Sequence, residues 1–352
     1  MFQPKVIYSL DELVKLQESS HDYNFSGYDL SSIDFSSAYG QEVLSQLQYS
    51  TTTIFPAELQ ELMMDKLEKA KNPGLNVQAM HKAGYRGKGI KIAIIDQNTD
   101  PSHPALEGHI QNVELSSFSE PSYHGPAVDS IAISVAPGAE IIHLSTGGRH
   151  DDNLANQALK YIVDYNNNPE NEKIRFVSCS WGNELSLSDD RKKLFQELEQ
   201  QDVMILGGYW RAGERRTAGL YRDLTKSTND PKSYYSNDRN ATKPGIPIGD
   251  CTFASKNGGY TFDHIGGASW TYPYLAAIGA CALQANPDFV NQKGWQDKLW
   301  QLMLETGVPM SNEPNSNRII QPTKLCKHMH EMYLQAHPTI QSTIQGKGKD
   351  SR

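Results

Sequence analysis

Short apolar runs alternate with stretches of helical periodicity from about residue 84 onward. The runs predict strands buried on both faces, and we expect them at 90–95, 140–144, 176–180 and 203–206. Between them, apolar residues recur every three or four positions, as in amphipathic helices. This spacing predicts helices at 153–165, 189–200 and 270–284. Strands that alternate with helices predict an α/β fold, a parallel sheet flanked by helices.

The first 72 residues have a different pattern and are expected to form an N-terminal extension. They are polar and Ser-rich, and apolar positions then recur at helical spacing over 56–67. Within them, 24–38 has a bulky residue at every fifth position, Phe25, Leu30 and Phe35, each preceded by Asn or Asp and followed by Ser. This resembles pentapeptide-repeat coils, whose bulky residues face inward. Three pentads are few for such a solenoid, so a Ser/Asp-rich loop with accidental spacing is an equal alternative.

Residues 73–336 are expected to form the main domain. Inside it, 209–269 is rich in Gly, Pro, Asn, Asp and Ser, and its runs 227–231 and 243–247 are expected to form loops. The polar segment 337–352 is expected to be a disordered tail.

Composition narrows the class of protein. Hydrophobic residues make up 38% of the 352 residues, and no stretch approaches the roughly 18 apolar residues of a membrane span. The net charge of −8 argues against nucleic acid as a partner. The N-terminus lacks the pattern of a secretory signal, which favours a cytoplasmic location. The four cysteines lack metal-binding spacing and are expected to be structural, and no cofactor is expected.

Two segments each contain a residue that could take part in catalysis or binding. The apolar run 91–95 ends in Asp96, and functional groups gather at the carboxyl ends of parallel strands. By itself Asp96 could equally be a helix cap or turn residue. His124 precedes Gly125-Pro126, and Pro fits the first turn of a helix, so the imidazole is expected at a helix N-terminus facing a cleft. A surface or capping His is the alternative.

A third segment places a serine before an Ala-rich apolar helix. Gly266-Gly267-Ala268 leads into Ser269, and such small residues let the backbone approach a substrate closely. Backbone N–H groups at the start of the helix would point at a developing negative charge. The alternative is an ordinary N-cap serine.

Together the three segments resemble the subtilisin-like serine peptidases, in that family's chain order of Asp, His and Ser. The resemblance extends from about Val77 to Pro287 and implies a subtilisin-like fold. It implies that Ser269 is the nucleophile, His124 the general base and Asp96 the residue that orients the imidazole. It also implies a peptide or protein substrate and no cofactor. The same resemblance implies substrate contacts from Ser180, Trp181, Gly182, Gly207 and Gly208.

Several positions depart from the family pattern. Tyr209 stands where the family has the Asn that helps to form the oxyanion hole, and in subtilisin loss of that Asn lowers kcat by about a hundred- to a thousandfold. Gln97-Asn98 and Pro126-Ala127 replace the usual Thr-Gly and Thr-His. Ala105 replaces a frequent Asp, so we infer no calcium or other metal site.

The function expected from these features is hydrolysis of a restricted peptide substrate, such as a precursor peptide, through an acyl-enzyme. The alternative is a pseudopeptidase that binds a peptide or protein without cutting it. An esterase fits less well, because the Gly-x-Ser-x-Gly motif is missing around Ser269. The extension could be an inhibitory prosegment, a docking module or a self-processing site.

Overall fold

The structure of the chain is a computed structural model. It describes residues 3–18, 24–117, 120, 122–147, 152–180, 187–207, 210, 215–236, 242–313 and 315–339. The parts of the predicted tail beyond residue 339 lie outside this range, as do Trp181, Gly182, Gly208 and Tyr209.

A parallel five-stranded sheet forms the centre of the fold, with strand order β5-β6-β4-β7-β8. The strands are β4 (Lys91–Asp96), β5 (Ile110–Glu114), β6 (Glu140–Ser145), β7 (Ile174–Cys179) and β8 (Met204–Gly207). Four of them confirm the predicted strands. β5 was missed because its sequence, Ile-Gln-Asn-Val-Glu, is half polar, as suits an edge strand.

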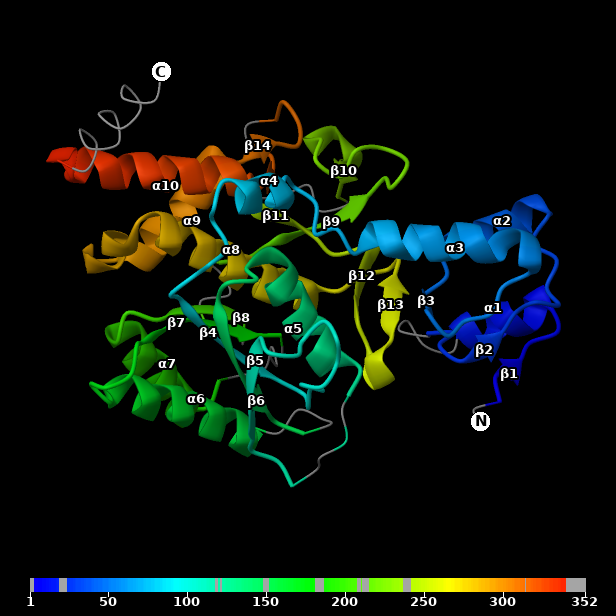
Figure 1. Ribbon diagram of the computed structural model, residues 1–352, viewed down its shortest axis with the longest axis horizontal. Helices are drawn as coiled ribbons and strands as arrows, with labels where there is room; N and C mark the ends of the chain where they lie inside the picture. Colours follow the sequence, from blue (N-terminus) through cyan, green and yellow to red (C-terminus); the bar gives the residue numbers. More distant parts are fainter. Residues whose placement is uncertain are drawn as a thin grey trace, which may run out of the picture.

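Helices cover both faces of this sheet (Figure 1). Side chains alternate along each strand, so Ile92 and Ile94 of β4 face one layer while Ala93 and Ile95 face the other. The first layer contains α5 (His124–Val135) and α8 (Thr271–Ala285), and the second contains α6 (Asp152–Asn167) and α7 (Asp189–Gln200). The three predicted helices and the α/β class are confirmed.

The segment 209–269 has a strand in one of its two predicted loop runs, 243–247, and no strand in the other, the fully described 227–231. The segment contains the short strands β9 (Ala218–Arg222), β10 (Tyr234–Tyr235), β11 (Pro244–Pro247), β12 (Cys251–Ala254) and β13 (Tyr260–Asp263), and the 3₁₀ turns η1 (Pro231–Ser233), η2 (Lys256–Gly258) and η3 (Ala268–Trp270). β11 pairs in parallel with β9, which lies well before it in the chain, and a local composition rich in turn residues does not reveal such a pair.

The C-terminal part of the main domain packs on the layer that contains α8. It consists of η4 (Pro287–Asn291), α9 (Trp295–Thr306), β14 (Val308–Pro309), β15 (Arg318–Ile319) and α10 (Pro322–Ala336), with α4 (Val77–Lys82) beside α10. β15 lies between β11 and β14 in a second five-stranded sheet, order β10-β9-β11-β15-β14. Within the described part of the chain, no helix has the length and apolarity needed to cross a membrane.

The extension has a hydrophobic cluster of its own and lies to one side of the central sheet (Figure 1). Its elements are β1 (Lys5–Val6), α1 (Leu10–Glu18), β2 (Tyr28–Asp29), α2 (Ala38–Ser45), β3 (Tyr49–Ser50) and α3 (Ala57–Ala70). The bulky residues of the three pentads, Phe25, Leu30 and Phe35, are all buried in this cluster. In each pentad the Asn or Asp side chain accepts a hydrogen bond from the backbone N–H two residues later, at 2.8–2.9 Å.

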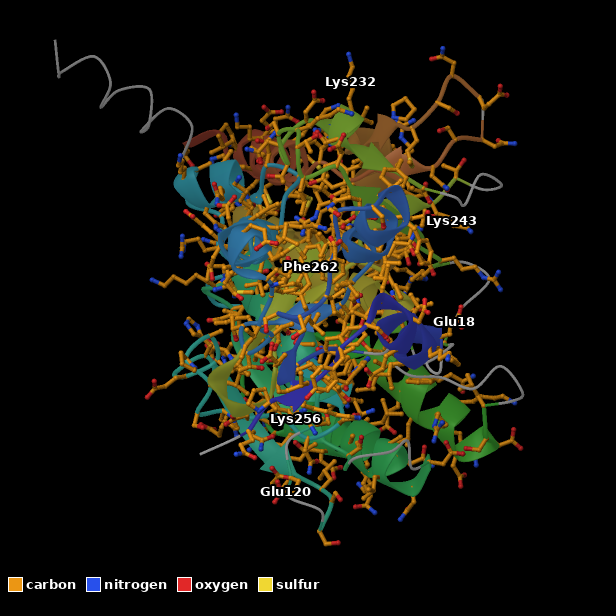
Figure 2. All side chains as sticks on the ribbon, turned by 90° about the vertical axis from the view of Figure 1, so that its right-hand side faces the viewer. Glu18, Glu120, Lys232, Lys243, Lys256 and Phe262 are labelled. Atoms are coloured by element: carbon orange, nitrogen blue, oxygen red, sulfur yellow. The ribbon has the colours of Figure 1, made fainter. Side chains whose placement is uncertain are left out.

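The extension is tied to the main domain through a shared sheet. β3 pairs antiparallel with β13, which pairs with β12. Phe262 of β13 belongs to the cluster of the extension, where its ring stacks on Tyr49 with centroids 5.0 Å apart. Figure 2 views the molecule from the side of the extension, with Phe262 near the middle of that face. Arg222 further holds the start of the connection by donating to the Ala70 and Asn72 carbonyls.

Candidate active site

Asp96 lies at the carboxyl end of β4, as the sequence predicts, and is only 2% exposed. Its Oδ1 accepts hydrogen bonds from His124 Nδ1 at 2.6 Å and from the Gln97 backbone N–H at 2.7 Å. The Thr146 backbone N–H and hydroxyl both donate to the Asp96 carbonyl, at 2.8 and 2.9 Å, and hold the end of the strand. The carboxylate therefore has a fixed position from which to orient the imidazole.

His124 is the first residue of α5. The Ser122 hydroxyl caps this end of the helix, because it accepts from the N–H groups of His124 and Gly125 at 3.0 Å each. A Cβ atom at Gly125 would lie 2.4 Å from the Asn98 carbonyl oxygen and 2.5 Å from that of Gln97. The glycine thus permits the close approach that brings His124 onto Asp96.

Ser269 lies in η3, directly before α8. Its hydroxyl donates to the Ser180 carbonyl at 3.2 Å, and the Ser180 hydroxyl donates to the Ser269 carbonyl at 2.8 Å. Ser180 directly follows β7, so these two bonds tie the segment around Ser269 to the end of the central sheet.

Trp270, the residue after Ser269, packs against the His124 ring, with centroids 5.1 Å apart and planes inclined by 30°. Its indole Nε1 donates to Asp263 Oδ2 at 3.0 Å. The other oxygen of Asp263 accepts from Gln48 Nε2 of the extension at 2.9 Å. Asp263 and Gln48 are both buried. A chain of polar contacts thus links the extension to the indole that packs against His124, a role that no local motif indicates for Gln48 or Asp263.

A second carboxylate–imidazole pair lies behind the first. Asp129 of α5 bonds His143 Nδ1 of β6 at 2.7 Å, and both side chains are fully buried. The other nitrogen of His143 lies 2.8 Å from the Gln97 carbonyl, and Thr99 donates to Asp129 at 2.5 Å. The pair therefore holds the segment that follows Asp96. Burial alone lowers the pKa of His143, but the Asp129 charge and hydrogen bond outweigh it, so the net pKa is raised.

Replacing Asp129 by Ala is expected to lower the free energy of unfolding by about 3–5 kcal/mol, because it leaves a buried imidazole without its charged partner. The folded-state pKa of His143 lies above the ordinary 6.5, so the stabilisation is complete below pH 6.5 and is lost as the pH rises through the raised value. The stability difference from wild type, measured by urea unfolding, should therefore be larger at pH 6 than at pH 9.

The matched control is Asp164→Ala, which breaks an exposed ion pair with Lys160 in α6. Its expected cost is about 0–1 kcal/mol, because solvent screens the pair. Equal losses in the two variants, or a difference that grows with pH, would contradict the role assigned to the buried pair.

The predicted substrate contacts are partly described. Ser180 lies at the end of β7, and Gly207 ends the neighbouring strand β8 with φ of +86°. A Cβ atom at Gly207 would lie 2.0 Å from the Cys179 carbonyl oxygen, so only glycine fits there. Trp181, Gly182, Gly208 and the predicted oxyanion residue Tyr209 lie outside the described residues.

The described residues contain no cluster of three or more His, Cys, Asp or Glu side chains that could hold a metal ion. The four cysteines are unbridged, and Cys179, Cys281 and Cys326 are buried. Burial raises the pKa of the Cys179 thiol, which stays protonated and packs as a small hydrophobic group.

No family model matches the sequence. The chain is 23% identical over 273 residues to a probable subtilase-type serine protease of Deinococcus radiodurans, an alignment that covers 61% of this chain and 36% of the relative. The chain thus spans about a third of the length of that protein.

A solved structure, that of the prenylagaramide maturation protease PagA, has the same fold. The TM-score is 0.52 at 17% sequence identity, and the match covers 72% of this chain and 98% of PagA. The two findings confirm the resemblance drawn from the Asp, His and Ser segments and the α/β fold that it implies.

Proposed function

We propose that this chain, which resembles the subtilase-type serine proteases in sequence and has a protease fold, is a serine endopeptidase that acts through an acyl-enzyme. The observation that carries the proposal is the 2.6 Å hydrogen bond between the buried Asp96 carboxylate and His124, with Trp270, the residue after Ser269, packed against the same imidazole. An imidazole that is oriented by a buried carboxylate is the arrangement that activates a serine hydroxyl.

In the proposed reaction the Ser269 hydroxyl rotates away from the Ser180 carbonyl and transfers its proton to His124 Nε2. Its oxygen attacks the carbonyl carbon of the peptide bond, and the backbone N–H of Ser269 donates to the resulting oxyanion. Collapse of the intermediate breaks the C–N bond, and His124 returns the proton to the departing amine. Water, deprotonated by His124, then hydrolyses the ester.

The substrate class we propose is a restricted one, such as a precursor peptide. PagA, which shares the fold, is a maturation protease. We propose that extended substrate pairs with the backbone at Ser180, Trp181 and Gly182, beside Gly207 and Gly208 at the end of β8. Tyr209 is proposed to complete the oxyanion hole.

A binding protein without catalytic activity is the second candidate. Two observations favour it: the amide expected at position 209 is replaced by a phenol, and the Ser269 hydroxyl bonds a carbonyl in this structure.

Labelling with a fluorophosphonate probe, followed by mass mapping of the modified peptide, separates the two. The endopeptidase requires a phosphonylated Ser269 at neutral pH in folded protein, because the probe reacts with an activated hydroxyl and not with ordinary serines. Unlabelled but folded protein, or a label distributed over surface serines, would favour the binding protein.

A further inference from the structure

A cavity of about 820 Å³ opens beside His124, between the extension and the main domain. The extension forms one wall, with Ser26, Ser50 and Thr52. Gln97, Tyr123 and His124 form the opposite wall, and the segment around η2 supplies Lys256. The cavity therefore lies directly next to His124, the proposed general base. Without the extension, one side of the cavity would be open.

The wall formed by the extension is held firmly. Its strand β3 pairs with β13, and Ser50 in that strand bonds Ser26 at 2.9 Å. The Thr52 hydroxyl accepts from the Gly27 backbone N–H at 2.9 Å. The β13 strand also carries Asp263, which connects Gln48 to Trp270. Removing the extension would expose Phe262 and break this connection, so the extension fits a permanent part of the site better than a prosegment that is cut off.

The chemistry of the cavity favours a negatively charged group. The residues that line it carry hydroxyl or amide groups, the imidazole of His124 and one ammonium group, that of Lys256, and there is no carboxylate in the described lining. This is unusual in a chain of net charge −8. Among the described residues Lys256 forms no ion pair, and it is an exposed residue of the cavity lining. Hydroxyl groups and an ammonium group together suit a carboxylate.

The position of the cavity indicates which part of a substrate would enter it. His124 must deliver a proton to the departing amine, so the part of the peptide that leaves lies on the imidazole side of Ser269. Of the described residues that line the cavity, none is Ser180 or Gly207, which belong to the strand ends proposed to pair with the other part of the peptide.

We propose that the extension and Lys256 form a binding site for an acidic side chain on the leaving-group side of the cleaved bond. This inference rests on the proposed endopeptidase activity and adds a specificity-determining residue to it. A substrate with Asp or Glu shortly after the cut would place its carboxylate near the Lys256 ammonium group and the hydroxyl groups of Ser26 and Thr52.

The test uses the full chain and a library of internally quenched decapeptides in which Glu or Gln occupies each position in turn. Glu at one position after the cut is expected to raise kcat/KM about fivefold over Gln, the gain of one partly exposed ion pair. Lys256→Glu should abolish or reverse this preference. Lys232→Glu makes the same charge change at the opposite end of the molecule, as Figure 2 shows, and should keep it.

The outcomes separate this inference from the proposed function. Cleavage without a preference for Glu, or a preference that Lys256→Glu leaves intact, would overturn the acidic site and leave the endopeptidase standing. If no peptide is cut, the same library is immobilised and probed with fluorescently labelled protein. Binding that favours acidic peptides and falls in Lys256→Glu but not in Lys232→Glu would support the site in a binding protein, and its absence would overturn it.

Discussion

Replacing Ser269 by Ala is expected to lower kcat for peptide hydrolysis by about a millionfold, as loss of the nucleophile does in subtilisin. Without the hydroxyl no acyl-enzyme forms, and only the residual catalysis of the binding site and oxyanion donors remains. The fold should tolerate the change. The lost hydrogen bond to the Ser180 carbonyl contributes about 0.5–1.5 kcal/mol, and the reciprocal bond from the Ser180 hydroxyl remains.

Product formation measured by mass spectrometry, with urea unfolding in parallel, checks this expectation. Ser134→Ala is the matched control, because it removes a half-buried hydroxyl that bonds the Ile131 carbonyl on the same helix as His124 but ten residues further along. That variant should retain wild-type kcat. If Ser269→Ala keeps the activity of wild type, the observed hydrolysis belongs to another site or to a contaminant.

The central sheet and its helices could be predicted from sequence because their patterns are local. The strand residues 92–95 are all apolar since both faces of the strand are covered, and α7 repeats its apolar residues at helical spacing. β5 was not predicted because an edge strand needs fewer apolar residues. The short strands β9 and β11 are stabilised by each other and by β15, so their own composition indicates only turns.

The candidate site also has residues that could be predicted from sequence and residues that could not. Asp96, His124 and Ser269 each stand in a recognisable local motif, and their joint order made the prediction specific. Gln48 and Asp263 could not be found, because each is an ordinary polar residue and their bond joins positions 215 residues apart. Only the folded chain shows that the extension supports the indole beside His124.

The buried pair of Asp129 and His143 is a similar case. Asp129 follows His124 by five residues, and alone it looks like a polar position of a helix. His143 interrupts an apolar strand, an irregularity that could have indicated a buried partner. Sequence patterns do not say which carboxylate faces which imidazole, because that depends on the register of β6 against α5.

Replacing Asp96 by Asn is expected to lower kcat by about ten thousandfold while the fold is retained. An amide has nearly the shape of the carboxylate, so the acceptor for Gln97 remains and the end of β4 keeps its position. The charge that stabilises the imidazolium is lost, because a neutral amide replaces the carboxylate that bonds His124 Nδ1. Fluorophosphonate labelling of Ser269 should slow by a similar factor.

Asp129→Asn provides the contrast, because it changes a carboxylate on the helix of His124 that bonds a different imidazole, that of His143 in β6. We expect this variant to lose stability, as measured by urea unfolding, and to change kcat by less than about tenfold, since His143 contacts no reacting atom. The opposite result, with Asp129→Asn inactive and Asp96→Asn active, would mean that the 2.6 Å bond between Asp96 and His124 only stabilises the fold and that the catalytic base lies elsewhere. The ratio of the two kcat values therefore tests the assignment of Asp96 independently of any loss caused by partial unfolding.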